Sequence, residues 1–279
     1  MKTLPQHIGP IGVFDSGYGG LTILEKIRHE LPEYDYLYLG DNARTPYGNR
    51  SFEVVYAYTL QCVTKLFEQG CHLVILACNT ASAKALRTIQ QHDLPKLDSN
   101  RRVLGVIRPT AEIVGSLTQS RNVGILATEG TIQSQSYVLE IGKFSPDINV
   151  TGEACPMWVP LIENNEHLTE GADYFVKKHI SRIIERNPKI DTLILGCTHY
   201  PLLLPKIKNY TPKNVRIVPQ GDIVARSLRN YLANHPEMEK KCSKNGTVKF
   251  LTTESPEKFK SSASIFLQEE IEAQHIAID

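Results

Sequence analysis

The stretch HLVILACNTA, residues 72–81, has a close counterpart in DTLILGCTHY, residues 191–200. Each stretch is an apolar run followed by a small residue, a cysteine and then polar residues. A short, continuous apolar run of this kind is typical of a strand that is buried on both faces of a parallel sheet. Cys78 and Cys197 are therefore both predicted to lie at the carboxyl end of a strand.

Two further pairs of segments repeat in the same order along the chain. IGVFDS, residues 11–16, parallels VGILAT, residues 123–128, and EIV at 112–114 echoes DIV at 222–224. One such match is expected by chance, because parallel strands share apolar runs. Three matches in the same order indicate an internal duplication, so we expect two similar α/β halves that each present one cysteine.

Apolar runs alternate with segments of helical spacing along the chain. Strands are predicted at 11–14, 36–39, 73–77, 103–107, 123–126, 150–152, 192–195 and 215–218, and the clearest helices at 21–31, 50–67 and 170–184. This alternation is typical of the α/β class, in which helices flank a mainly parallel sheet. The duplication predicts two pseudo-symmetric lobes with the active site in the cleft between them.

The lobe boundaries follow from two proline-containing strand ends. The first lobe is expected to comprise residues 1–107 plus 219–279, with Asp15 and Cys78, and the second residues 108–218, with Cys197 and His199. The chain would cross between the lobes near Ile107–Thr110 and return near Val218–Asp222.

Composition excludes several classes of function. The 279 residues are 41% hydrophobic and 22% charged, with a net charge of +1, which is ordinary for a globular protein and gives no sign of nucleic-acid or membrane binding. Residues 1–10 are too short and polar for a signal peptide, and no apolar run approaches the roughly 20 residues of a membrane span, so a cytoplasmic protein is expected. Six cysteines without a C-x-x-C pair predict free thiols and no metal site.

The two repeated cysteines suggest proton-transfer chemistry. Strand ends next to helix N-termini favour anions, including a carboxylate substrate and a thiolate. Racemisation at an amino-acid α-carbon needs a base on one face and an acid on the other, which two opposed thiols would supply. The alternative, two buried core thiols, is weakened by the polar residues that follow them: Asn79, Thr80, Thr198 and His199. For Cys62 and Cys71, which lie within or just after a helical stretch, we prefer the core interpretation.

Two turns could add to a site at these strand ends. Asp15-Ser16-Gly17-Tyr18-Gly19-Gly20 follows the first strand, and its glycines would let the backbone approach a ligand closely. A plain strand-to-helix turn explains this segment equally well. Pro46-Tyr47-Gly48 is a turn by composition alone.

These segments together resemble glutamate racemases of the aspartate/glutamate racemase superfamily, and the similarity spans nearly the whole chain. The segments that carry it are FDSGYGGLTIL (14–24), YLGDNARTPYG (38–48), ACNTAS (77–82), GVIRPT (105–110), ATEGTIQSQSY (127–137), ACPMWVPLIE (154–163), LGCTHYPLL (195–203) and TTESPEKFK (252–260).

The resemblance implies a role for each matching residue. Cys78 and Cys197 would be the two acid/base groups, supported by Asp15 and His199 respectively, with Glu163 as an auxiliary catalytic residue. Substrate would be bound by Asp15, Ser16, Pro46, Tyr47, Gly48, Asn79, Thr80, Thr128, Thr131, Thr198 and His199. The activity implied is interconversion of L- and D-glutamate without cofactor or metal, supplying D-glutamate for peptidoglycan, in a homodimer. A pyridoxal enzyme would need a Schiff-base lysine, and Lys84, the one nearest Cys78, is expected to face solvent.

Three alternatives stay open at this point. The chain could racemise another substrate such as aspartate. It could be a cysteine hydrolase with Cys197 as nucleophile and His199 as base, although this leaves the repeated Cys78 unexplained. It could also be a non-catalytic module that binds a carboxylate ligand between two lobes.

Overall fold

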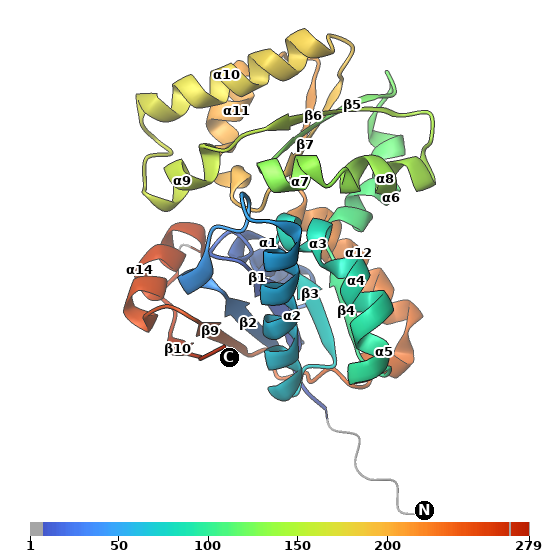
Figure 1. Cartoon of the computed structure of the whole chain (residues 1–279), viewed down its shortest axis with the longest axis vertical. Coiled ribbons are helices and arrows are strands. Elements are labelled where there is room, and N and C mark those ends of the chain that lie inside the picture. Colours follow the sequence, from blue (N-terminus) through green and yellow to red (C-terminus); the bar gives the residue numbers. More distant parts are fainter. Residues whose placement is uncertain (1–7, 268, 279) are drawn as a thin grey trace, which may run out of the picture.

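The structure, a computed structural model, describes residues 8–267 and 269–278 and contains two parallel sheets (Figure 1). In the described residues one sheet has six strands in the order β10-β9-β2-β1-β3-β4, and the other has four in the order β6-β5-β7-β8. The strands are β1 (Ile11–Asp15), β2 (Tyr36–Gly40), β3 (Leu73–Leu76), β4 (Arg102–Gly105), β5 (Asn122–Ala127), β6 (Asn149–Ala154), β7 (Thr192–Gly196), β8 (Arg216–Val218), β9 (Val248–Thr252) and β10 (Ala273–His275). The predicted fold class, two α/β lobes with parallel sheets, is confirmed.

The two sheets share one strand order, which supports the internal duplication. The order β2-β1-β3-β4 in the first sheet matches β6-β5-β7-β8 in the second. β1 therefore corresponds to β5, and β3, which precedes Cys78, corresponds to β7, which precedes Cys197. The chain leaves the first sheet after β4 and returns after β8, while the exact lobe boundaries at 107/108 and 218/219 stay a prediction.

Helices connect the strands and cover both sheets. They are α1 (Leu21–Glu30), α2 (Phe52–Glu68), α3 (Asn79–Lys84), α4 (Leu86–Thr88), α5 (Leu94–Leu97), α6 (Ile107–Leu117), α7 (Glu129–Gln133), α8 (Ser136–Phe144), α9 (Trp158–Glu163), α10 (Glu170–Arg186), α11 (Leu204–Tyr210), α12 (Gly221–Asn234), α13 (Pro236–Glu239) and α14 (Pro256–Leu267), with the short turns η1 (Asn42–Arg44), η2 (Ile89–Asp93) and η3 (Tyr200–Leu203). Among the described residues, none of these helices has the length and apolar character needed to cross a bilayer.

One predicted strand end is wrong. We expected a strand over 103–107 that runs into a proline, but β4 ends at Gly105 and Ile107 already begins α6. Pro109 lies in the first turn of that helix, where backbone N–H groups have no partner within the helix, so a residue without an N–H is tolerated. The proline therefore marks a helix start rather than a strand end.

The alternation of side chains along β1 divides the first lobe's core into two layers. Ile11 and Val13 belong to a buried cluster with Leu24 of α1 and Leu228 of α12, whereas Phe14 packs in a second cluster with Val63 of α2. Successive side chains of a strand point to opposite faces, so both faces of this sheet must be covered by apolar helix faces. This packing fixes the strands whose ends carry Asp15 and Cys78.

A carboxylate at the start of β7 stabilises the turn that leads into β5. Asp191 accepts hydrogen bonds from the Thr118 hydroxyl (2.6 Å) and from the backbone N–H groups of Gln119 and Ser120 (2.7 Å each). Burial opposes ionisation, but these hydrogen bonds outweigh it and lower the pKa of Asp191 from 3.8 to about 2. The ionised carboxylate is thus part of the folded structure.

We expect Asp191→Asn to lower the free energy of unfolding at pH 7 by about 2 kcal/mol, the typical contribution of a hydrogen bond to a charged group. Since the folded-state pKa is depressed, the stabilisation is present above about pH 4 and is lost as the pH falls from about 4 to about 2. The free energies of unfolding of wild type and variant, measured by urea unfolding at several pH values, should therefore converge as the pH falls. The exposed Glu185→Gln on α10 is the control, and a difference that persists at pH 2 would contradict this account.

Candidate active site

Four strand ends converge on one cavity between the two sheets. β1 ends at Asp15 and Cys78 follows β3, while Thr128 follows β5 and Cys197 follows β7. All four residues line a cavity of about 130 Å³. A cavity of this size suits a molecule as small as an amino acid, because sites for drug-sized ligands measure about 300–1,000 Å³. The structure thus brings the two cysteines together from equivalent positions in the two lobes.

The cavity lining comes from both lobes and is rich in hydroxyl, amide, carboxyl and thiol groups. The described residues that line it are Asp15, Ser16, Thr45, Pro46, Tyr47, Gly48, Asn49, Cys78, Asn79, Thr80, Thr128, Glu129, Cys155, Pro156, Val159, Pro160, Cys197 and Thr198. Neither lysine nor arginine is among them. A carboxylate bound here would therefore be held by hydroxyl and N–H donors rather than by a cationic side chain.

Cys78 caps the N-terminus of α3. Its sulfur accepts a hydrogen bond from the backbone N–H of Ala81 (3.4 Å) and lies 3.3 Å from the hydroxyl of Ser16. Burial, and after it the negative charge of Asp15, raises the pKa of the Cys78 thiol to about 12. Cys78 is therefore a protonated thiol at neutral pH.

Cys197 begins a chain of polar contacts that runs away from the cavity. Its sulfur lies 3.9 Å from Nδ1 of His199, and Nε2 of that ring lies 2.9 Å from a carboxylate oxygen of Glu163. Burial lowers the pKa of His199, but the hydrogen bonds and negative charges of Cys197 and Glu163 outweigh it and raise the pKa to about 10. His199 is thus a cation at neutral pH and stands behind Cys197 rather than in the cavity wall.

The glycine-rich turn after β1 brings the two lobes together. Oδ2 of Asp15 accepts a hydrogen bond from the backbone N–H of Gly17 (2.9 Å), while Oδ1 is buried with no hydrogen-bond partner among the described residues. Burial raises the pKa of Asp15 above its usual value. A side chain at Gly19 would place its Cβ 2.3 Å from Nδ1 of His199 and 2.4 Å from Oγ1 of Thr198. The sequence was consistent with close approach of a ligand or with a plain turn; at Gly19 the structure shows close approach of the second lobe.

Hydroxyl groups also join the lobes at the cavity wall. The Thr80 hydroxyl lies 2.9 Å from that of Thr128 and 3.3 Å from that of Thr131. Of the two second-lobe threonines, Thr128 lines the cavity and Thr131 lies behind it. The backbone carbonyl of Thr198 accepts a hydrogen bond from the Thr22 hydroxyl of α1 (2.9 Å), which fixes the segment after Cys197 against the first lobe.

The side-chain amide of Asn79 is engaged in a buried network. Its nitrogen donates to Oε1 of Gln220 (2.8 Å), and its oxygen accepts from the hydroxyl of Tyr137 (2.7 Å). Gln220 also donates to Tyr137 (2.8 Å) and to the Thr110 hydroxyl (3.0 Å). Sequence reasoning missed Tyr137 and Gln220, although Gln220 is a polar residue shortly after β8, the same signal that identified Asn79.

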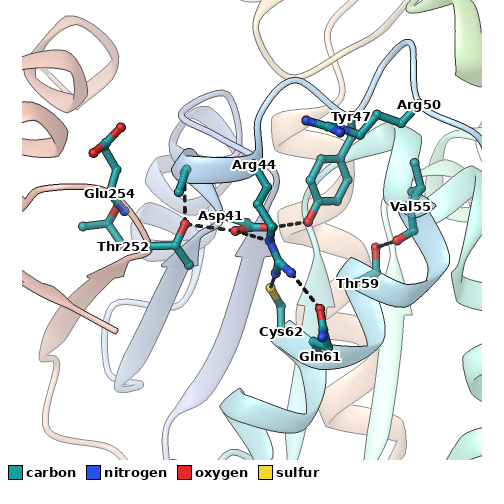
Figure 2. Close-up of polar contacts among 12 residues, drawn as sticks. Asp41, Arg44, Tyr47, Arg50, Val55, Thr59, Gln61, Cys62, Thr252 and Glu254 are labelled. Carbon is teal, nitrogen blue, oxygen red and sulfur yellow. Dashed lines mark hydrogen bonds and ion pairs between the residues drawn. The ribbon is translucent and has the colours of Figure 1, made fainter. Parts of the chain in front are cut away.

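The segment Pro46-Tyr47-Gly48 forms one wall of the cavity. The Tyr47 ring is buried beside Phe14 and Tyr58, and its hydroxyl donates a hydrogen bond to Asp41 (Figure 2). The phenol is thus directed away from the cavity, so this residue offers backbone rather than hydroxyl groups to a ligand.

Several cavity residues lie inside segments that sequence analysis quoted without giving them a role. They are Thr45, Glu129, Cys155, Pro156, Val159 and Pro160, and Asn49 lies one residue beyond such a segment. Cys155 is fully buried, as expected of a core thiol, and it also faces the cavity. No apolar-to-polar change marks this position, because β6 is NVTGEA and Cys-Pro-Met-Trp follows it; what Cys155 shares with Cys78 and Cys197 is its place just after a strand.

The expectation that Lys84 faces solvent is wrong. The residue is buried, and its ammonium group donates a hydrogen bond to the backbone carbonyl of Arg50 (2.5 Å) and lies over the Phe52 ring. The segment before α2 packs on α3 and covers this side chain, which helical spacing alone could not indicate. Burial lowers the pKa of Lys84.

A second cavity among the described residues lacks the reactive groups of the first. A shallower hollow of about 600 Å³ lies beside β6, but its lining, which includes Asn149, Thr151 and Arg186, contains no thiol, imidazole or carboxyl group. The described residues contain no group of three or more metal-binding side chains, and all six cysteines are free thiols.

Comparisons with known proteins agree with the geometry. A sequence model of the family described as Asp/Glu/Hydantoin racemase matches residues 11–228. A glutamate racemase from Roseobacter denitrificans is 38% identical over 272 residues, which cover 94% of this chain and 98% of that protein. Among solved structures, a glutamate racemase isoform from Bacillus anthracis has a TM-score of 0.88 at 33% identity, covering 97% of this chain and 98% of the other. A glutamate racemase from Francisella tularensis, solved in complex with D-glutamate, has a TM-score of 0.86 at 33% identity, with the same coverage.

Proposed function

Because this chain belongs to the Asp/Glu/Hydantoin racemase family, it is an amino-acid racemase, and we propose that it interconverts L- and D-glutamate by two-base proton transfer between Cys78 and Cys197. The observation that carries the proposal is the pair of thiols at equivalent strand ends of two similar lobes, both lining one cavity of amino-acid size. Relatives named glutamate racemase along nearly the whole chain support the choice of substrate.

In the proposed mechanism each cysteine serves one face of the α-carbon. With L-glutamate, the Cys197 thiolate removes the α-proton, and the C–H electron pair stays on carbon as a carbanion. The Cys78 thiol then donates its proton to the opposite face, which yields D-glutamate and leaves Cys78 as thiolate and Cys197 as thiol. D-glutamate reacts by the same steps in reverse.

The surroundings of the two sulfurs favour this starting state. A cationic His199, held by Glu163, lies beside Cys197 and would stabilise a thiolate there. Cys78 faces the negative charge of Asp15, and its raised pKa favours the thiol. With Cys197 as thiolate and Cys78 as thiol, the enzyme would be ready to deprotonate L-glutamate.

Substrate recognition is proposed to use short polar groups. The unpartnered Oδ1 of Asp15 could accept a hydrogen bond from the substrate ammonium group. The hydroxyls of Ser16, Thr80 and Thr128 and the N–H groups at the start of α3 could hold the carboxylates. Asn79, whose amide is engaged with Gln220, and Thr198 would contribute through their backbone.

We expect the purified protein to remove the optical rotation of L-glutamate and of D-glutamate. The kcat/KM for either enantiomer should be at least about tenfold above that for aspartate, because one methylene is worth about 1–3 kcal/mol in a pocket. Activity should survive exhaustive chelation, and the protein should show no aldimine absorbance. Comparable kcat/KM for aspartate would refute the substrate. Loss of activity that an added metal restores would refute the cofactor-independent mechanism, and slow ester hydrolysis without racemisation would indicate a cysteine hydrolase.

The physiological proposal rests on the family. The enzyme would work in the cytoplasm as a homodimer and supply D-glutamate for peptidoglycan. A deletion strain that grows only with added D-glutamate would support this role, and sedimentation analysis would test the dimer.

A further inference from the structure

The segment between β2 and α2 forms a wall of the cavity and is held from behind. Residues Thr45 to Asn49 line the cavity, whereas Asp41, at the carboxyl end of β2, lies behind them with its side chain fully buried (Figure 2). The backbone N–H of Asp41 donates to the carbonyl of Asp15 (3.0 Å). This residue is therefore tied directly to the strand end that carries a proposed substrate-binding carboxylate.

The Asp41 carboxylate accepts hydrogen bonds from three residues, two in the segment between β2 and α2 and one just after β9. It accepts two hydrogen bonds from Nε of Arg44 (2.7 and 3.0 Å), one from the Thr253 hydroxyl (2.9 Å) and one from the Tyr47 hydroxyl. Burial raises the pKa of Tyr47, so its hydroxyl remains protonated and acts as the donor. Hydrogen bonds to an ionised acceptor are about twice as strong as neutral ones.

Arg44 extends the same cluster to α2. Its guanidinium donates to Oε1 of Gln61 (2.7 Å) and to the sulfur of Cys62 (3.4 Å), and it lies 4.1 Å from the centre of the Tyr58 ring. The segment between β2 and α2 is thus held to α2 by the Arg44 side chain and to Asp41 by the Tyr47 hydroxyl.

The other side of this wall touches the second lobe. The carbonyl of Gly48 accepts a hydrogen bond from the backbone N–H of Gly130 (2.8 Å). A Cβ at Gly130 would lie 2.8 Å from that carbonyl oxygen, so the close approach depends on glycine. Gly130 follows the cavity residue Thr128 by two positions. A displacement of residues 45–49 would therefore also displace the side of the cavity that the second lobe forms.

We propose that Asp41 is a positioning residue that, through Tyr47 and Arg44, sets the place of the substrate-facing backbone at residues 45–49. This inference rests on the proposed function, since it concerns the same cavity. The side chain of Asp41 does not line the cavity. It therefore affects substrate binding through the position of residues 45–49, and proton transfer only indirectly. Loss of its charge should loosen the wall without removing a catalytic group.

The test compares two buried carboxylates at opposite ends of β2. Asp41→Asn should raise KM for D- and L-glutamate about tenfold with a smaller fall in kcat, because misplacing a substrate-positioning group by about 1 Å can cost up to 10²-fold. Asp35→Asn is the matched control: Asp35 accepts hydrogen bonds from Asn245 and Thr247 and holds a loop remote from the cavity. It should lower the melting temperature while leaving KM within about twofold of wild type.

Tyr47→Phe keeps the ring and removes only the hydroxyl, so it should raise KM in the same direction even if Asp41→Asn folds poorly. Because both changes break one contact, the double variant should be no worse than Asp41→Asn alone. A KM for Asp41→Asn no higher than that of Asp35→Asn, or additive effects in the double variant, would overturn the proposal. Failure of wild type to racemise glutamate would instead reject the proposed function, and calorimetric titration of D-glutamate into the same variants would then decide the role of Asp41 without turnover.

Discussion

Replacing Cys78 by alanine is expected to abolish racemisation in both directions, and Cys197→Ala is expected to do the same. Each direction needs one sulfur as base and the other as acid, so neither variant keeps a complete pair. A positioned acid or base contributes about 10²- to 10⁴-fold to a rate, so kcat should fall by at least that factor for both enantiomers. Both cysteines line the same cavity and follow equivalent strands of the two sheets, so removing either one leaves the other without its counterpart.

The control variant for this prediction is Cys71→Ala. Cys71 precedes β3 and Cys78 follows it, so the two thiols lie at opposite ends of one strand. Cys71 is buried in the core cluster of α2 and remote from the cavity lining. Its variant should lose some stability and keep its activity. Substantial racemisation by Cys78→Ala or Cys197→Ala, measured by circular dichroism with each enantiomer, would end the two-cysteine mechanism.

Deuterium from solvent provides a second, independent readout of the same mechanism. In deuterated water the product should carry deuterium, because the acid on the opposite face has exchanged with solvent. The substrate recovered early should carry little, because its proton stays with the first base. A single base would deliver the same proton or deuteron to either face, so substrate and product would carry deuterium to the same extent from the start. Equal early labelling of substrate and product would therefore point to one base.

The strands that carry the site could be predicted because each is a continuous apolar run buried on both faces. β1, β3, β5 and β7 fall where the sequence indicated, and the polar residues after them meet at the cavity. β9 and β10 were missed for a physical reason. β9 begins with a half-buried valine and an exposed lysine, and β10 has only three residues, so both depend on pairing with distant strands rather than on a local apolar run.

The parts of the site that escaped prediction depend on contacts between segments far apart in the chain. Lys84 has the spacing of an exposed helical residue, yet the segment before α2 covers it. The family resemblance implied a ligand contact for Tyr47, but its hydroxyl donates to Asp41 instead. Periodicity predicts which face of an element is apolar, whereas these partners are fixed only when the sheets are assembled.

His199→Asn is expected to slow L-glutamate more than D-glutamate. The ring of His199 lies between the sulfur of Cys197 and the carboxylate of Glu163, with its pKa raised to about 10. Without this cation the thiolate needed to deprotonate L-glutamate is less populated in the substrate complex. We expect kcat for L-glutamate to fall about 10- to 100-fold, the rate equivalent of losing a hydrogen bond to a charged group, about 1.5–3 kcal/mol.

The two directions are linked by thermodynamics, which makes the asymmetry testable. The enantiomers have equal free energies in water, so kcat/KM must fall equally in both directions, and the smaller loss of kcat for D-glutamate requires its KM to rise relative to that for L-glutamate by the same factor. Glu163→Gln keeps a hydrogen-bond acceptor for the ring but removes the charge that raises the pKa of His199. The cationic ring is lost as the pH rises through its pKa, so this variant should lose L-glutamate turnover at a lower pH than wild type. Two results together would show that His199 does not support Cys197 as the base. The first is an equal loss of kcat in both directions for His199→Asn, and the second is a pH–rate profile of Glu163→Gln whose alkaline limb coincides with that of wild type.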